Sequence, residues 1–381
     1  MPDKNMHIYG ITGTNGKTTM SYLLTSILEQ VYGKEKVGML TTVAFRIAGI
    51  EEFNATKMTT LPSKKIFAYL KKMKDTGVTH VVLETTSHAL DQNRLAGILF
   101  DGAIILNIAR EHLDYHKTME QYAAAKERIV QFLKKDAPVI GKQDDEYVRV
   151  IMDRAEKVGV RVVRMTQENI AETNTPLAGS INKENAAAAS LLARAVGIAE
   201  KNIAEGIDDV KKVPGRMEKI IAAQGFTVII DYAVTPDALE RLYSDIKKDV
   251  NTKRILATLS AAGLRDRGKR PDMARAVAKY ADRIVVTNED PWTEPDEQIY
   301  RDLESGLPSP YQGEGGGEVD RGVDWQRIPD RKEALRNLLQ EAKSGDVVVC
   351  TGKGAERGMG IGKEIVPWNE REVIEEILRD L

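Results

Sequence analysis

The sequence predicts an α/β protein, in which a P-loop domain built on a parallel sheet is followed by a second, Rossmann-like α/β domain. Short apolar runs rich in Val and Ile alternate with longer amphipathic or alanine-rich segments, which is the pattern of βαβ units. A glycine-rich turn joins the first apolar run to the first helical segment, as in phosphate-binding loops. With 381 residues, the chain is long enough for two such domains.

The first half of the chain alternates strongly. Its expected elements, in order, are a strand at 7–11, a helix at 18–31, strands at 78–84 and 102–108, a helix at 119–133, a strand at 139–141, and helices at 182–196 and 203–210. The apolar runs are continuous rather than alternating, as expected for strands of a parallel sheet that is covered on both faces. Alanine, the strongest helix former, dominates 182–196.

The pattern restarts after Pro214-Gly215, where proline and glycine end a helix and turn the chain. Strands are then expected at 226–231, 254–259, 283–287 and 346–351, with helices at 236–248 and 272–280. We therefore expect two domains, at 1–213 and 214–381. Residues 307–322 are rich in Pro, Gly and Glu, which favours a surface insertion.

Composition excludes several classes of protein. The net charge of −2 argues against a general binder of nucleic acid or of membrane surfaces. The single cysteine, Cys350, cannot form an internal disulfide, and no run of 18 apolar residues is present. The sequence therefore predicts a cytoplasmic protein that acts on small molecules, with neither nucleic acid nor membrane as partner.

The glycine-rich turn is the most specific chemical signal. It reads Gly13-Thr14-Asn15-Gly16-Lys17-Thr18-Thr19. Backbone N–H groups of such a turn and the positive end of the next helix bind phosphate oxygens, Lys17 reaches the β- and γ-phosphates, and Thr18 can bind magnesium. The strict eight-residue pattern fails because Ile11 stands at its first glycine, so the shorter variant carries the prediction of ATP or GTP.

Further candidates follow two other strands. Glu84 ends an apolar run, where an open parallel sheet places ligand groups, and is a candidate magnesium ligand with His88 close behind. Segment 107–116 contains two histidines and two carboxylates within six positions. Zinc is disfavoured because an H-E-x-x-H frame and a nearby cysteine are both missing. Lys126 lies at the edge of an apolar helical stripe, where lysines commonly extend to solvent.

Together these motifs resemble those of the Mur ligase family, most closely its UDP-N-acetylmuramoyl-tripeptide synthetases. The resemblance is carried by Gly-Thr-Asn-Gly-Lys-Thr at 13–18, Glu-Thr-Thr-Ser-His-Ala-Leu at 84–90, Glu-His-Leu-Asp-Tyr-His at 111–116, Tyr-Ala-Ala-Ala-Lys at 122–126, Pro-Gly-Arg-Met-Glu at 214–218 and Gly-Lys-Gly-Ala-Glu at 352–356. It implies an ATP-dependent ligase of peptidoglycan synthesis. An acceptor carboxylate becomes an acyl phosphate, and the amine of an amino acid displaces the phosphate.

The resemblance also implies roles for individual residues. The implied catalytic residues are Lys17, Glu84, His112, Lys126 and Arg216. The implied ATP site comprises Gly13, Thr14, Asn15, Gly16, Lys17, Thr18, Thr19, Asn182, Asn185, Arg216 and Asp231. The implied Mg²⁺ ligands are Thr18, Glu84, His112 and Lys126, the last as a carbamate. The implied substrate contacts are Thr59, Thr60, Ser87, His88 and Arg94 for the acceptor, and Asp290, Trp292, Gly352 and Glu356 for the amino acid.

Three departures accompany the resemblance. Met1–Met6 alone precede the first strand, so we expect the family's N-terminal UDP-binding domain to be lacking or supplied by a separate chain. Trp292 stands where diaminopimelate-adding members carry an arginine that pairs with a substrate carboxylate. Val234 and Ala355 replace two histidines of the family pattern.

Two other functions stay open at this point. One is a ligase of the same superfamily that acts on a smaller acceptor, as folylpolyglutamate and cyanophycin synthetases do. The other is a nucleotide-binding regulatory protein without turnover, which the replaced histidines would suit. An enzyme is favoured because the chain retains all five implied catalytic residues, Lys17, Glu84, His112, Lys126 and Arg216.

Overall fold

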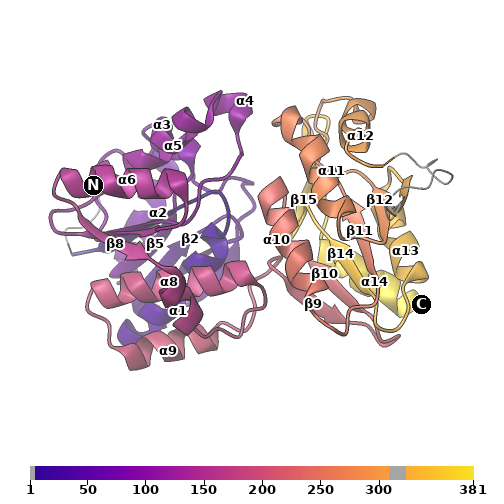
Figure 1. Ribbon diagram of the computed structural model, residues 1–381. Coiled ribbons are helices and arrows are strands. Elements are labelled where there is room, and N and C mark those ends of the chain that lie inside the picture. The colour runs from indigo at the N-terminus through magenta and orange to yellow at the C-terminus, as the bar shows by residue number, and fades with distance from the viewer. Residues whose placement is uncertain (1–4, 309–322) are drawn as a thin grey trace. The chain divides into compact units, whose positions relative to one another are not determined.

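The computed structural model describes residues 5–308 and 323–381. The chain forms two compact units: unit 1 contains Met1–Ala109 and His116–Val213, and unit 2 contains Arg110–Tyr115 and Pro214–Leu381. Each unit is a sheet with helices on both faces, which confirms the predicted α/β class (Figure 1). Most of the predicted insertion at 307–322 lies outside the described residues.

The sheet of unit 1 has eight strands within the described part of the chain, in the order β4-β3-β2-β5-β1-β6-β7-β8. The strands are β1 His7–Thr12, β2 Val37–Leu40, β3 Ala44–Ile47, β4 Ile50–Phe53, β5 His80–Glu84, β6 Gly102–Ile105, β7 Pro138–Lys142 and β8 Arg161–Met165. All neighbours from β2 to β8 pair in parallel, whereas β3 and β4 are antiparallel. Strand β1 lies between β5 and β6, so the segments after these three strands share one edge of the sheet.

The helices of unit 1 are α1 Lys17–Tyr32, α2 Ser63–Asp75, α3 Ser87–Asp91, α5 Met119–Glu127, α6 Glu146–Lys157, α7 Gln167–Glu172, α8 Ser180–Ala195 and α9 Glu200–Asp209, and α4 Leu113–His116 spans the boundary with unit 2. Helices α1, α8 and α9 pack together over one apolar core. A β-carbon at Gly206 of α9 would lie 2.5 Å from Cα of Ile27, so only glycine permits this approach of α9 to α1.

Unit 2 contains a six-stranded sheet in the order β13-β12-β11-β14-β10-β9, counted over the described residues, and a separate β15-β16 hairpin. Its strands are β9 Glu218–Ile221, β10 Thr227–Ile230, β11 Ile255–Leu259, β12 Arg283–Val286, β13 Asp324–Arg327, β14 Val347–Cys350, β15 Gly358–Ile361 and β16 Glu364–Pro367. Its helices are α10 Pro236–Lys247, α11 Arg270–Ala278, α12 Asp296–Glu304, α13 Arg331–Glu341 and α14 Glu370–Asp380. Strands β10 to β14 are parallel, and β9 is antiparallel.

One predicted helix is shorter than expected. The pattern at 119–133 predicted a continuous helix, but α5 ends at Glu127 and a 3₁₀ turn spans Arg128–Phe132. The backbone carbonyl of Phe132 accepts a hydrogen bond from Phe100 N–H at 2.6 Å, and Leu133 forms a bridge with Phe100. The chain tightens there because it must return to the sheet edge before β7 begins.

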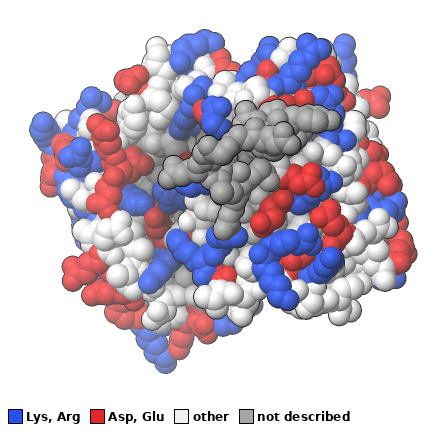
Figure 2. Space-filling view, turned by 45° about the vertical axis from the view of Figure 1, so that its right-hand side comes forward, with Lys and Arg blue, Asp and Glu red and all other residues white. Residues whose placement is uncertain are grey.

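On the face shown in Figure 2, Lys and Arg are interspersed with Asp and Glu, in keeping with the small net charge. None of the described helices is long and apolar enough to cross a membrane.

Candidate functional site

The glycine-rich turn joins β1 to α1. Gly16 has φ +88°, and α1 begins at Lys17 with neither a side-chain cap nor an acidic residue in its first turn. The N–H of Thr14 donates to the Asn107 carbonyl, and the N–H of Asn15 donates to Oδ1 of Asn107, both at 2.8 Å. The turn is therefore anchored to the segment after β6, while the first turn of α1 keeps the positive character that attracts phosphate.

Two lysines converge on this turn. Nζ of Lys17 donates to the carbonyls of Gly13 and Thr14 at 3.0 Å, and Nζ of Lys126 donates to the same Gly13 carbonyl at 2.8 Å. The expectation that Lys126 extends to solvent is wrong, because its side chain is buried and lies 4.6 Å from the ring centroid of Tyr122. Thr14 in turn bonds the Tyr122 hydroxyl at 3.1 Å. Helix α5 thus delivers a buried ammonium to the phosphate loop.

Glu84 ends β5 beside β1, with which it pairs at Ile11. Its carboxylate is fully buried, and Oε2 accepts hydrogen bonds from N and Oγ1 of Thr42 at 2.7 and 2.6 Å. Oε1 is buried without a hydrogen-bond partner in the described part of the chain. Leaving such an oxygen unpaired is costly, whereas a divalent cation would satisfy it. The carboxylate therefore fits the predicted role as a magnesium ligand.

The predicted acceptor residues Thr59, Thr60 and Arg94 lie around this carboxylate. Oγ1 of Thr42, which donates to Glu84, lies 2.9 Å from Oγ1 of Thr59, and Oγ1 of Thr60 donates to the Glu84 carbonyl at 2.9 Å. The Arg94 guanidinium donates to the Thr60 carbonyl at 2.9 Å. Residues far apart in the sequence therefore form one connected polar network at the end of β5.

Ser87 and His88 begin α3, immediately after this strand end. Oγ of Ser87 and Nε2 of His116 are 3.0 Å apart, and the rings of His88 and His116 meet edge to face at 5.3 Å. The ring of His116 also lies 5.3 Å from that of Tyr122. These contacts connect the predicted acceptor residues to α5, the helix that carries Lys126.

Asn182 and Asn185 lie in the first turns of α8 and are buried. Nδ2 of Asn185 donates to Oδ1 of Asn182 at 3.4 Å, and Asn182 donates to the Ala178 carbonyl at 2.6 Å. Asn185 also lies directly against Gly16 of the phosphate loop. The structure thus places Asn185 against the loop with Asn182 hydrogen-bonded to it, and the contact of both with a nucleotide stays a prediction.

His112 belongs to segment Arg110–Tyr115, which is part of unit 2, and has φ +56°. Its neighbour Glu111 accepts hydrogen bonds from Nζ of Lys269 at 2.9 and 3.1 Å. Within residues 5–308 and 323–381, no three His, Cys, Asp or Glu side chains form a group that could hold a metal ion. The predicted set also uses Thr18, which is buried, and Lys126; its completion by His112 stays a prediction.

In unit 2, Asp231 follows β10 and fixes two backbone segments. Its carboxylate accepts hydrogen bonds from the N–H groups of Met217 at 2.7 Å and Ala233 at 2.8 Å. Burial raises the pKa of Asp231, against the opposing effect of Arg216. The Arg216 guanidinium lies 4.6 Å from the ring centroid of Tyr232. Asp231 therefore shapes the loop that carries Arg216.

The predicted amino-acid residues meet around a buried lysine. Nζ of Lys353 donates to Oδ1 of Asp290 and to Oε2 of Glu356, at 2.7 Å each. Burial lowers the pKa of Lys353, but the adjoining carboxylates outweigh it and leave the pKa raised. Gly352 has φ +99°, and a β-carbon there would lie 2.4 Å from Oε2 of Glu289.

Trp292 contacts the hairpin residue Gly360, whose N–H donates to Oδ1 of Asp290 at 2.7 Å. The indole covers Gly360, where a β-carbon would approach Cε2 to 2.4 Å, and the backbone N–H of Trp292 donates to the Gly360 carbonyl at 3.0 Å. The indole thus packs against β15, and its contact with a substrate stays a prediction.

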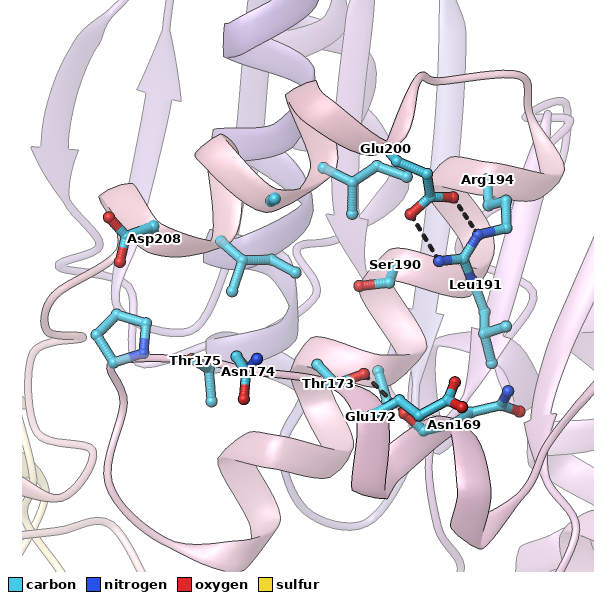
Figure 3. A pocket seen from close by; sticks show the side chains of 15 residues that line it. Asn169, Glu172, Thr173, Asn174, Thr175, Ser190, Leu191, Arg194, Glu200 and Asp208 are labelled. Carbon is cyan, nitrogen blue, oxygen red and sulfur yellow. Dashed lines mark hydrogen bonds and ion pairs between the residues drawn. The ribbon is translucent and has the colours of Figure 1, made fainter.

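A cavity of about 620 Å³ opens elsewhere in unit 1. It lies among the segment after α7, helix α8 and helix α9, and its wall includes the ion pair of Arg194 with Glu200 (Figure 3). None of the predicted site residues lines it.

Sequence reasoning missed Thr42 and Asn107 as site residues. Both follow strands that end at the same sheet edge as Glu84, β2 for Thr42 and β6 for Asn107. The position of Asn107 after an apolar run was a usable signal. Thr42 was harder to find, because β2 is four residues long and was not predicted.

Comparison with known proteins matches both units. Residues 11–173 match the Mur ligase middle domain, and residues 215–354 match the Mur ligase glutamate ligase domain. The chain is 35% identical over 402 residues to UDP-N-acetylmuramoyl-L-alanyl-D-glutamate--2,6-diaminopimelate ligase of Geobacillus kaustophilus (strain HTA426). The aligned region covers 98% of this chain and 78% of that protein.

Two further matches agree. UDP-N-acetylmuramyl-tripeptide synthetase of Roseiflexus sp. (strain RS-1) is 35% identical over 405 residues, covering 97% of this chain and 78% of that protein. A solved structure of a UDP-N-acetylmuramoyl-L-alanyl-D-glutamate--2,6-diaminopimelate ligase aligns with a TM-score of 0.61 at 28% identity, over 99% of this chain and 79% of its own.

Proposed function

Because this chain belongs to the Mur ligase family, we propose that it is an ATP-dependent ligase that joins an amino acid to the carboxylate of a muramoyl-peptide precursor of peptidoglycan. One observation carries the proposal. Lys17 and Lys126 meet at Gly13 of the phosphate loop, and the neighbouring strand end holds the buried, unpartnered Oε1 of Glu84. A lysine cation beside an anion-binding loop, with a second buried lysine and a carboxylate close by in the fold, suits phosphoryl transfer.

The reaction would proceed in two steps. An oxygen of the acceptor carboxylate attacks the γ-phosphorus, and the bond to ADP breaks, which gives an acyl phosphate. The neutral amine of the amino acid then attacks the acyl carbon, the bond from this carbon to the phosphate oxygen breaks, and the nitrogen loses one proton as the amide forms. Lys17 and Arg216 would stabilise charge on the transferred phosphoryl group, and Asn182, Asn185 and Asp231 would hold the nucleotide.

Thr18, Glu84, His112 and Lys126 would hold Mg²⁺, which neutralises phosphate charge when bound. An ammonium repels a cation, so Lys126 would serve as a carbamate, formed when its neutral amine adds CO₂ and loses a proton. The buried position of Lys126 beside the loop supports a role in the site, because a purely solvating lysine would remain exposed.

Substrates would be held by two groups of residues. Thr59, Thr60, Ser87, His88 and Arg94 would contact the acceptor, and Asp290, Trp292, Gly352 and Glu356 the amino acid. The names of the two curated relatives favour a muramoyl peptide over a smaller acceptor. Because the reaction consumes ATP, we place it in the cytoplasm.

A phosphate-release assay tests this function. The enzyme is given ATP, Mg²⁺, UDP-muramoyl dipeptide and one amino acid at a time, with diaminopimelate, lysine and ornithine included. We expect release that needs both the acceptor and one amino acid, and a product heavier by that residue in mass spectrometry. Release with a pteroyl or dipeptide acceptor instead would indicate the smaller-acceptor ligase, and ADP binding without turnover in any combination would indicate a regulatory protein.

A further inference from the structure

A buried arginine of unit 2 joins the segments that carry the predicted amino-acid residues. Arg331 begins α13, and its side chain is 1% exposed. Nη1 donates to the Asn288 carbonyl at 3.1 Å and to Oγ of Ser260 at 3.3 Å, and Nη2 donates to the Thr351 carbonyl at 2.7 Å. Ser260 directly follows β11, Thr351 directly follows β14, and Asn288 lies shortly after β12. All three partners therefore lie at one edge of the sheet.

The remaining donors of Arg331 engage the last helix. Nε and Nη2 form a bidentate pair with the Glu370 carboxylate at 2.9 and 2.6 Å, and Trp368 Nε1 donates to the same carboxylate at 2.8 Å. Five hydrogen bonds are thus directed from one planar guanidinium, a geometry that lysine cannot reproduce. The first residue of α14 is thereby fixed to the strand ends.

Ser260 connects Arg331 to the predicted amino-acid residues. Oγ of Ser260 donates to Oε2 of Glu289 at 3.0 Å, and this carboxylate lies against Gly352. Glu289 directly precedes Asp290, which Lys353 joins to Glu356. A shift of Arg331 would therefore displace both loops that supply these residues.

We propose that Arg331 is a positioning residue for amino-acid binding, acting through Ser260 and the backbone of the loops after β12 and β14. The proposal rests on the proposed function, since it assigns the amino acid to these loops. Arg331 touches none of the reacting groups in this scheme. Its loss should weaken capture of the amino acid and leave ATP use largely intact.

The test compares Arg331→Lys, Ser260→Ala and the double variant in the full chain. Loss of a charged hydrogen bond predicts a KM for the amino acid raised at least about tenfold, with the KM for ATP within about twofold. The two changes should be less than additive, because both interrupt the contact of Arg331 with Ser260. Ser260→Ala keeps the buried ion pair and avoids the large destabilisation that follows when such a pair is broken.

Arg283→Lys is the matched control. Arg283 is buried at the start of β12, at the opposite edge of the same sheet, where it pairs with Asp324 and Glu341. The substitution Arg283→Lys should lower the melting temperature without a selective change in the KM for the amino acid. Additive effects, or equal changes in both KM values, would overturn the positioning role. A wild-type enzyme without amino-acid-dependent phosphate release would instead contradict the proposed function, and the positioning role with it.

Discussion

The side-chain oxygen Oδ1 of Asn185 lies so close to the phosphate loop that a β-carbon at Gly16 would be 2.3 Å from it. Asn185 is 1% exposed on α8, and Gly16 precedes α1 with φ +88°. Two independent constraints therefore require glycine here: a left-handed backbone and the absence of a side chain. The contact places the second turn of α8 directly against the phosphate loop.

Gly16→Ala should destabilise the fold by at least about 1–2 kcal/mol from the left-handed backbone alone, and should also weaken ADP binding because the loop must move away from Asn185. Gly159→Ala is the control, since Gly159 has φ +83° with nothing within 4 Å of a β-carbon. Urea unfolding and ADP titration separate the two effects. The prediction fails if both variants lose the same ADP affinity.

Glu84→Gln should lower the rate of phosphate release by about 10²–10³-fold, because a charge-stabilising group is lost. The free energy of unfolding should stay the same or rise. The amide carbonyl can still accept from Thr42, and a neutral group replaces a buried carboxylate oxygen that has no hydrogen-bond partner in the described structure. Phosphate release against Mg²⁺ concentration, with urea unfolding, checks both parts. Marked destabilisation without a changed Mg²⁺ dependence would show a structural role.

Lys126→Ala should abolish turnover, and the type of rescue should identify the chemical form of the lysine. A carbamate predicts partial recovery with short carboxylates, such as acetate. An ammonium that simply holds the Gly13 carbonyl predicts recovery with ethylamine instead. Lys134→Ala, which removes an ion pair with Asp101 elsewhere in unit 1, should retain activity. Wild-type rates in Lys126→Ala without any additive would exclude Lys126 from catalysis.

Much of the fold was predictable because its central strands are continuous apolar runs. Glu84 was found because it ends such a run, and the loop at 13–18 because its glycines and lysine form a compact motif. Strands β2, β3 and β4 were missed: each is four residues long, and Gly38 and the charged residues of β4 weaken the pattern.

Pairings across the chain were not predictable from local sequence. The helical stripe gave Lys126 a position on α5, but its carbonyl partner lies 113 residues away, and the burial of its side chain follows from that packing. The contact of Trp292 with Gly360 likewise depends on a hairpin that local patterning did not reveal. Distant neighbours, rather than propensities, decided these positions.

Acid should destabilise unit 1 through His80. Burial lowers the pKa of His80 to about 4, with a further contribution from His7, and its ring stacks on that of Tyr32 at 3.7 Å. Because folding lowers this pKa, His80 takes up a proton at a higher pH in the unfolded chain than in the folded chain. The stabilisation is therefore complete above about pH 6.5 and is lost as the pH falls towards 4.

His80→Phe tests this, because phenylalanine keeps the stacking and cannot be protonated. The urea midpoint of unfolding should fall from pH 7 to pH 5 in both proteins. The fall should be smaller for His80→Phe than for the wild type. An equal loss of stability on acidification in both proteins would assign the acid sensitivity to other groups.

Arg216→Ala should lower the rate far more than it weakens ADP binding. The guanidinium is held over the ring of Tyr232, on the loop that Asp231 fixes through Met217. ADP lacks the γ-phosphate, so a residue that acts on the transferred phosphoryl group contributes little to ADP affinity and about 10²–10³-fold to turnover. Asp231→Asn keeps Arg216 and changes the group that holds its loop, and it should cause a smaller rate loss that is not selective for chemistry. Rates and ADP titrations of both variants decide the matter, since equal losses of rate and ADP affinity in Arg216→Ala would mean that the guanidinium contacts the part of the nucleotide that ADP retains.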